Sequence, residues 1–179
     1  SDLLNNNNFI VKCWNYLNGK AYRNASFVVT ISNGLADKLI ETHPHIRSKI
    51  QVIYPWADTD FIKPVSSQQN QLYQKFNLNG KKVVLYAGNM GISHDIDSIV
   101  KAADLLRKHE EIYFLFVGGG EAYQKVKKFK LHNNLTNISI YNYQPLHLLP
   151  QLLSLATVSI VALEDDKQEL MVPSKLFSY

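Results

Sequence analysis

Short β-branched or aromatic segments alternate with amphipathic segments in the second half of the chain, and this alternation constrains the fold more than any other feature. It predicts strands over residues 82–87, 113–117, 137–141 and 157–161. It predicts helices over residues 95–109, 121–132 and 146–154, and a further helix that begins near Pro173. Strands and helices that alternate at this interval form βαβ units. We therefore expect an α/β fold, a Rossmann-like parallel sheet with helices on both faces.

The first third of the chain shows the same alternation on a smaller scale. A helix is predicted over residues 9–22, with strands over residues 26–32 and 49–54. The helix between these strands is predicted to be capped by Ser32 and stopped by Pro44. Cys13, on the first helix, is expected to be a core residue.

A change of composition then predicts a domain boundary. Residues 66–70 are polar and read as a linker, and a short helix is predicted over residues 71–76. We expect residues 1–55 to be the last part of one domain, residues 56–70 to be a connection, and residues 71–179 to belong to a second domain. Because the helix that starts near Pro173 has no predicted end, we also expect the sequence to be a fragment.

Composition excludes several classes of function. No apolar run is long enough to cross a bilayer, and no signal sequence opens at residue 1. The single cysteine excludes an internal disulfide framework and favours a cytoplasmic setting. A net charge of +4 mildly favours acidic ligands but is too small to indicate nucleic acid. The six histidines lack metal-ligand spacing, so no metal site is expected.

Two glycine-rich segments follow predicted strands, where open parallel sheets bind ligands. The first contains Gly88, Asn89 and Gly91, with His94 close by; such glycines allow the backbone to approach an anion such as phosphate. The second contains Gly118, Gly119 and Gly120, followed by Glu121. Each segment could equally be a structural turn.

A third segment, residues 164–175, combines four acids with Pro173, Ser174 and Lys175. Carboxylates at a strand end can bind sugar hydroxyls, and Lys175 could bind a diphosphate. Solvated acids are the alternative. The lysines at 125, 127, 128 and 130 are interpreted as a solvated helix face, with a membrane-surface patch as the alternative.

Taken together, these segments resemble the family 4 glycosyltransferases of the GT-B fold. Residues 52–64, a strand ended by Pro55 and then Asp58, Phe61 and Pro64, resemble the family's interdomain crossover. Residues 83–103 and 114–120 resemble the first two units of its donor-binding lobe. Residues 169–179 resemble its donor-binding segment.

The resemblance implies a role for each of these residues. Gly88 and Gly91 would line the diphosphate loop, where Asn89 and His94 stand in place of the family's usual arginine and lysine. Lys175 would then contribute to diphosphate binding, and Ser174, which follows Pro173 at the start of the predicted helix, is a candidate donor-binding residue beside it. The second glycine segment, including Glu121, would lie near the nucleoside base, as would residues 143–145. Glu169 takes the place of the glutamate near the donor sugar and is a candidate catalytic residue; Ser178 replaces the ribose-binding glutamate.

The resemblance further implies a retaining transfer of a sugar from a UDP-, GDP- or dTDP-sugar to an acceptor hydroxyl, without a cofactor or metal. The acceptor would be a glycan or lipid-linked sugar in polysaccharide or cell-envelope synthesis. A peripheral membrane contact is compatible with that role. Residues 1–55 would end the acceptor lobe, and the catalytic residues of that lobe would lie upstream. A non-catalytic nucleotide-sugar-binding module and a nucleotide-sugar 2-epimerase of the same fold remain alternatives.

Overall fold

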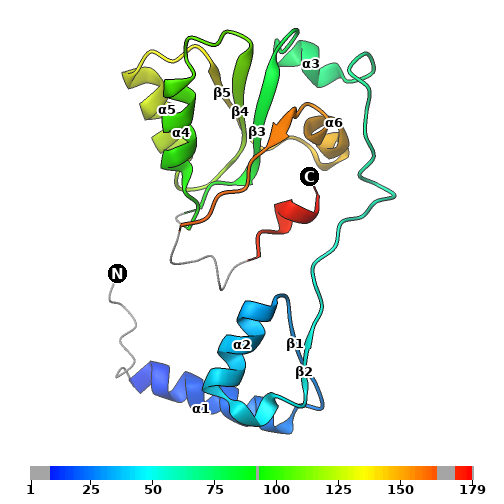
Figure 1. The fold of residues 1–179 in the computed structure, drawn as a ribbon, viewed down its shortest axis with the longest axis vertical. Helices are drawn as coiled ribbons and strands as arrows, with labels where there is room; N and C mark the ends of the chain where they lie inside the picture. The colour runs from blue at the N-terminus through cyan, green and yellow to red at the C-terminus, as the bar shows by residue number, and fades with distance from the viewer. Residues whose placement is uncertain (1–8, 92, 165–171, 179) are drawn as a thin grey trace. The chain divides into compact units, whose positions relative to one another are not determined.

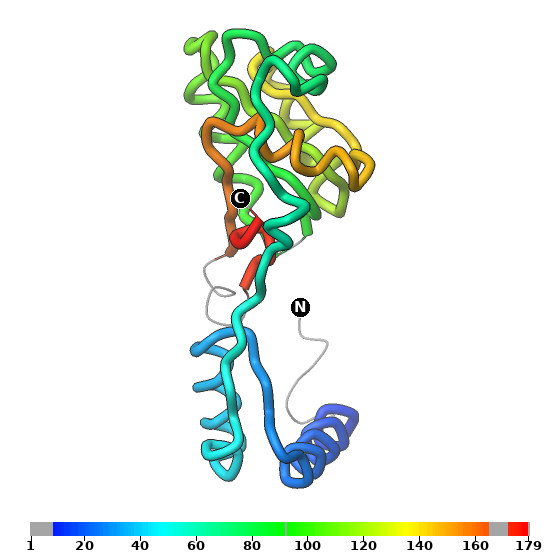
Figure 2. The backbone as a smooth tube through the Cα atoms, turned by 90° about the vertical axis from the view of Figure 1, so that its right-hand side faces the viewer, coloured from blue at the N-terminus to red at the C-terminus, as the bar shows by residue number. Residues whose placement is uncertain are grey.

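The computed structural model describes residues 9–91, 93–164 and 172–178 (Figure 1). The described chain forms two compact units. The first unit ends at Pro55, and the second runs from Trp56 and includes residues 173–178. No helix or strand occurs between Ile53 and Asn70, which the chain crosses as an irregular connection (Figure 2).

The first unit pairs two short parallel strands with helices. Its elements are α1 (Phe9–Asn24), β1 (Val28–Thr30), α2 (Asn33–Thr42), the 3₁₀ helix η1 (Pro44–Ile46) and β2 (Ile50–Val52). Val28 on β1 lies opposite Ile50 on β2. The predicted cap is confirmed, because Ser32 accepts a hydrogen bond of 3.1 Å from the Leu35 backbone N–H.

The second unit is built on four parallel strands among its described residues. Their order across the sheet is β5 (Ile138–Tyr141), β4 (Ile112–Gly119), β3 (Lys82–Asn89), β6 (Val158–Ser159). Its helices are α3 (Gln71–Lys75), α4 (Ile96–Leu105), α5 (Tyr123–His132), α6 (Leu149–Leu153) and the 3₁₀ helices η2 (Leu146–Leu148) and η4 (Ser174–Phe177). Helices cover both faces of this sheet, which confirms the predicted architecture (Figure 1).

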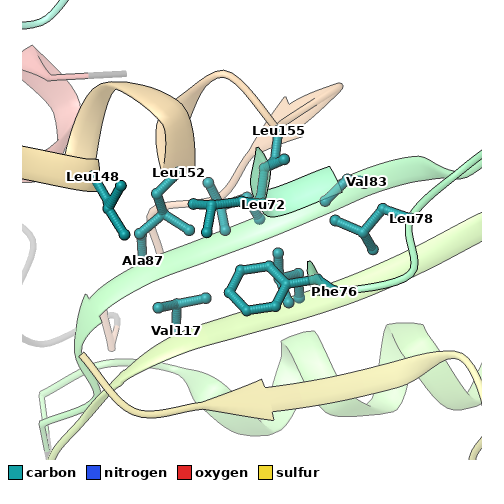
Figure 3. Close-up of a cluster of buried hydrophobic side chains, with 11 residues drawn as sticks. Leu72, Phe76, Leu78, Val83, Ala87, Val117, Leu148, Leu152 and Leu155 are labelled. Carbon is teal, nitrogen blue, oxygen red and sulfur yellow. The ribbon is translucent and has the colours of Figure 1, made fainter. Parts of the chain in front are cut away.

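Alternate residues of β3 supply the two halves of the core. Leu85 and Ala87 point to the face covered by α3 and α6, where they pack with Leu152 in the cluster drawn in Figure 3. Tyr86 points to the opposite face and packs with Ile99 of α4. The central strands are buried on both sides, which is why they read as continuous apolar runs in the sequence.

The strand ends differ from the prediction, because β3 and β4 both run two residues further and include glycines that were expected in loops. Gly88 pairs with Gly118, and Asn89 pairs with Gly119. A Cβ atom on Gly118, whose φ is +150°, would lie 1.9 Å from the Gly88 carbonyl oxygen. The absence of side chains therefore allows the two strands to stay paired up to the edge of the sheet.

Three other expectations are corrected. Cys13 is exposed and not in the core. It lies on α1, a helix whose one buried residue is Gly19, so this helix contributes almost nothing to a core. Glu121 lies in the turn before α5 and not in the helix. The helix predicted near Pro173 is the four-residue 3₁₀ helix η4 among the described residues.

Candidate functional site

A cavity of about 260 Å³, here called the apolar cavity, lies at the carboxyl ends of β3 and β4. Strand residues Ala87, Gly88 and Val117 form part of its wall. The opposite wall of the cavity is formed by η2, α6 and the residues just before η2, together with η4. That side consists of Tyr143, Gln144, Pro145, Leu146, Leu149, Leu152, Leu153, Ser174, Lys175 and Ser178. Most of the lining is hydrocarbon, which suits a flat, uncharged ring such as a base.

Lys175 supplies the positive charge in this lining. Its Nζ donates hydrogen bonds to the Tyr86 hydroxyl at 2.7 Å and to the Asn89 carbonyl at 3.2 Å. The same nitrogen lies 3.9 Å from the centroid of the Tyr86 ring, within cation–π range. Its alkyl chain crosses Gly88, where a Cβ atom would come within 2.8 Å of Lys175 Cε. Glycine at position 88 therefore makes room for the lysine.

The ammonium of Lys175 is held by neutral groups. Both of its hydrogen-bond acceptors are uncharged oxygens, and no salt bridge to it occurs within the part of the chain that the structure describes. Burial lowers its pKa to about 8. A partly buried cation without an opposite charge is a costly arrangement, and an incoming anion would relieve it.

His94 lies on the other side of Tyr86. Its Nδ1 is 2.5 Å from the Tyr86 hydroxyl oxygen. The hydroxyl donates its hydrogen to the Asn89 carbonyl at 2.9 Å. Burial, and secondarily the positive charge of Lys175, lower the pKa of His94. The imidazole is therefore neutral at pH 7, so Lys175 rather than His94 carries positive charge at this end of the sheet.

A second cavity of about 330 Å³, here called the polar cavity, begins at His94. Its lining is Gly91, His94, Asp95, Ile96, Asp97, Glu121, Ala122, Lys125 and Glu164. Its lysine, Lys125, is already paired with Asp97 at 2.6 Å. Asp95 caps α4, and hydrogen bonds from Ser98 lower the pKa of its carboxyl. This cavity is therefore rich in carboxylates that would repel a diphosphate.

The structure divides the predicted site residues between these cavities. Gly88, Ser174, Lys175 and Ser178 line the apolar cavity, whereas Gly91, His94 and Glu121 line the polar one.

Asn89, Gly118, Gly119 and Gly120 line neither cavity. A Cβ atom on Gly119 would contact the Tyr143 ring at 3.0 Å, and one on Gly120 would lie 2.3 Å from Asn89 Oδ1. Gly118 pairs with Gly88 across β3 and β4. Glu169 lies outside the described residues.

Tyr86 is the residue that sequence reasoning missed. It is 1% exposed within an apolar strand, so the sequence pattern marks it as core. The available signal was its hydroxyl, since a buried tyrosine two residues before a glycine at a strand end needs a polar partner. Its partner Lys175 is 89 residues away in the sequence.

Two negative findings apply to the described residues alone. None of their helices is both long and apolar enough to span a bilayer. They also contain no group of three or more His, Cys, Asp or Glu side chains arranged to hold a metal ion.

The chain is similar to glycosyltransferases of bacteria. It is 28% identical over 156 residues to WcaI of Escherichia coli (strain K12), which is named provisionally as a colanic acid biosynthesis glycosyl transferase. It is also 28% identical over 156 residues to WbjE of Pseudomonas aeruginosa, a probable glycosyltransferase. These alignments cover 86% and 87% of the chain but 38% of each relative, so the chain spans well under half of their length.

Solved structures confirm the fold class. The chain matches Anabaena Alr3699/HepE, solved in complex with UDP and glucose, with a TM-score of 0.63 and 14% identity. That match covers 83% of this chain and 41% of the other. A glycosyltransferase from Rickettsia africae matches with a TM-score of 0.62 and 20% identity, over 81% of this chain and 41% of the other.

The family assignment rests on a longer stretch than any single motif. Residues 68–168 match the family described as glycosyl transferases group 1. This stretch is more than half of the chain and contains both glycine segments, Tyr86 and most of the lining of both cavities. The chain therefore belongs to the group 1 glycosyl transferase family.

Proposed function

We propose that this chain carries the donor-binding half of a retaining family 4 glycosyltransferase. Its donor would be a UDP-, GDP- or dTDP-sugar, and its acceptor a hydroxyl of a glycan or lipid-linked sugar. Residues 71–179 would form the donor-binding lobe, and residues 1–55 the end of the acceptor lobe. The observation that carries the proposal is the ammonium of Lys175, held by neutral oxygens at the rim of the apolar cavity.

The lining of the apolar cavity matches the parts of such a donor. The base would stack against Tyr143 and Leu149, and the ribose hydroxyls would hydrogen-bond to Ser178. The diphosphate would lie over Gly88, where the backbone has no side chain, and would pair with Lys175. The diphosphate would give Lys175 a negatively charged partner, whereas the Tyr86 hydroxyl and the Asn89 carbonyl are neutral.

The same lysine would assist the reaction. The bond between the anomeric carbon and the β-phosphate oxygen would break while the acceptor oxygen bonds to that carbon on the same face, which retains its configuration. The proton of the acceptor hydroxyl would pass to the departing β-phosphate oxygen. Negative charge grows on the departing diphosphate as its bond to the carbon breaks. A fixed cation in a partly desolvated site stabilises this charge more in the transition state than in the ground state, which accelerates departure.

The relatives support the cellular role in this proposal. The name of WcaI refers to colanic acid biosynthesis. This name supports the proposal that the full protein acts in polysaccharide or cell-envelope synthesis. We further propose that it acts in the cytoplasm, at the inner face of the membrane.

A non-catalytic nucleotide-sugar-binding module is the second candidate. The observation that favours it is that neither Asn89 nor His94 supplies a positive charge near the diphosphate position. Turnover of a nucleotide sugar by the full-length protein distinguishes the two candidates. Release of nucleoside diphosphate in the presence of acceptor supports the enzyme; tight binding without release supports the module.

Binding by the chain itself is tested by calorimetric titration with UDP, GDP, dTDP and NAD. We expect one nucleoside diphosphate to bind, NAD to bind far more weakly, and Lys175→Ala to weaken binding at least tenfold. Lys125→Ala is the matched control, because it removes a lysine that is already paired with Asp97 in the polar cavity. If Lys125→Ala weakened binding as much as Lys175→Ala, the diphosphate could not be assigned to the apolar cavity.

A further inference from the structure

The Tyr86 hydroxyl stands between the two cavities. On one side it accepts a hydrogen bond from Lys175, which lines the apolar cavity. On the other side it meets Nδ1 of His94, which lines the polar cavity. The Asn89 carbonyl completes the arrangement by accepting from both the hydroxyl and the lysine. One hydroxyl on the central strand β3 is thus in contact with a residue of each cavity.

The burial of Tyr86 makes its hydroxyl a fixed reference point. Its ring packs against Phe116 with centroids 6.0 Å apart, and only 1% of the residue is exposed. The ring also lies beneath the Lys175 ammonium. Lys175, by contrast, belongs to η4, a short 3₁₀ helix. A four-residue turn offers little rigidity of its own, so the lysine depends on its contacts for position.

We infer that Tyr86 is a positioning residue, which holds the Lys175 ammonium over Gly88 at the diphosphate position by accepting its hydrogen bond. This inference rests on the proposed function. The ring alone would leave the ammonium free to slide across the aromatic face, since a cation–π contact has little directionality. The hydroxyl fixes one N–H direction, and the Asn89 carbonyl fixes a second. The third N–H then remains for a ligand oxygen.

The charged groups around this contact define its electrostatics. His94 faces Tyr86 and is neutral at pH 7. Beyond His94, the lining of the polar cavity adds Asp95, Asp97, Glu121, Glu164 and Lys125. Removal of the Tyr86 hydroxyl takes an acceptor away from the charged form of Lys175 and leaves these groups in place. The Lys175 ammonium should then lose its proton more readily.

The test compares Tyr86→Phe with the unmodified chain and with Tyr113→Phe. The control removes another hydroxyl of the same sheet, which is hydrogen-bonded to Ser139 at 2.6 Å and lies outside the linings of both cavities. The first readout is the titration of Lys175 followed by NMR of its ε-methylene group, without ligand. The second is calorimetric affinity for UDP.

We expect the Lys175 titration to move to lower pH in Tyr86→Phe and to stay unchanged in Tyr113→Phe. UDP affinity should fall about threefold to tenfold in Tyr86→Phe and less than about twofold in the control. A Lys175 titration that is the same in all three proteins would overturn the inference, because a purely structural role lowers stability without changing that titration. If the unmodified chain did not bind UDP, the proposed function would fail, and the ligand-free titration would still decide the role of Tyr86.

Discussion

The apolar and polar cavities lie at one end of the same sheet but offer opposite electrostatic environments. The apolar cavity has one half-buried lysine with neutral partners, whereas the polar cavity has one lysine paired with a carboxylate and further acids around it. Both contain a lysine and glycine-flanked backbone, so composition alone does not separate them. The two cavities differ in the partner of each lysine: a carboxylate for Lys125, and two neutral oxygens for Lys175. Among the described residues, Lys175 has only neutral hydrogen-bond partners beside a hydrocarbon lining. Under the proposed function, such a site would favour a ligand with an apolar end and an anionic end, as a nucleoside diphosphate has.

The largest effect is expected at Gly118, which pairs with Gly88 of the apolar cavity. Gly118→Ala places a Cβ atom 1.9 Å from the Gly88 carbonyl oxygen, so the ends of β3 and β4 must separate. We expect a loss of about 3 kcal/mol or more in the free energy of unfolding and loss of nucleotide binding. Chemical denaturation followed by circular dichroism measures the first quantity.

Gly80→Ala is the matched control for this substitution. Gly80 also has positive φ, +73°, but nothing lies within 4 Å of a Cβ atom there. Its cost should be only the backbone strain, about 1 to 2 kcal/mol. Equal losses for the two variants would show that Gly118 is constrained by its backbone angle and not by the approach of β3.

The second effect is the pH dependence of nucleotide affinity. With a pKa of about 8 in the free chain, Lys175 loses its proton as the pH rises through 8. A bound diphosphate favours the charged form, so the lysine of the complex titrates at higher pH. Affinity is therefore full below pH 8 and should fall by up to about tenfold per pH unit above it. Calorimetry between pH 6.5 and about 9.5 measures this fall.

Lys175→Ala should abolish the fall that begins at pH 8, leaving weak binding that changes little up to about pH 9. Lys125→Ala should retain it, because Lys125 lines the other cavity. A pH profile that is unchanged in Lys175→Ala would assign the titration to another group and remove the distinction between the cavities.

A smaller effect is expected from the apolar wall. Leu146 lines the apolar cavity and is 73% exposed, so Leu146→Ala should reduce nucleotide affinity about threefold to fivefold with little change in stability. Leu131→Ala provides the comparison, since Leu131 is 74% exposed on α5 and lies outside the linings of both cavities. Parallel calorimetric titrations measure both. Equal affinity of the two variants would contradict a base-binding role for this wall.

The smallest effect is expected in the polar cavity. Asp97→Asn breaks an exposed ion pair with Lys125, which should cost less than about 1 kcal/mol of stability. Nucleotide affinity should stay the same or rise slightly, because the change removes a negative charge and frees a lysine. Denaturation and calorimetry test the two statements. A clear loss of affinity would mean that the ligand uses the polar cavity.

The parallel sheet could be predicted because its signals are local. The central strands β3 and β4 contain continuous apolar runs, and the N-cap at Ser32 is a single residue. The extension of β3 and β4 through Gly88 and Gly118 could not be predicted in this way. It depends on two glycines, 30 positions apart in sequence, that lie opposite each other in the sheet.

The site was predictable in its parts but not in its arrangement. Glycines after strands and Lys175 after Pro173 mark residue types that bind phosphate. The division of these residues between two cavities depends on where the chain returns after β6, which no local pattern encodes. Tyr86 reads as core because its strand is apolar, and its contact with Lys175 becomes visible only when the two are brought together by the fold.

The most direct test of the central claim is the protection of individual lysines by UDP. Brief amine acetylation at pH 8, followed by mass spectrometry of peptides, gives the labelling rate of Lys175 and of Lys125 in the same sample. We predict that saturating UDP slows the labelling of Lys175 severalfold and leaves that of Lys125 unchanged. Protection of Lys125 but not Lys175, or of neither when UDP is bound, would contradict the assignment of the diphosphate to the apolar cavity.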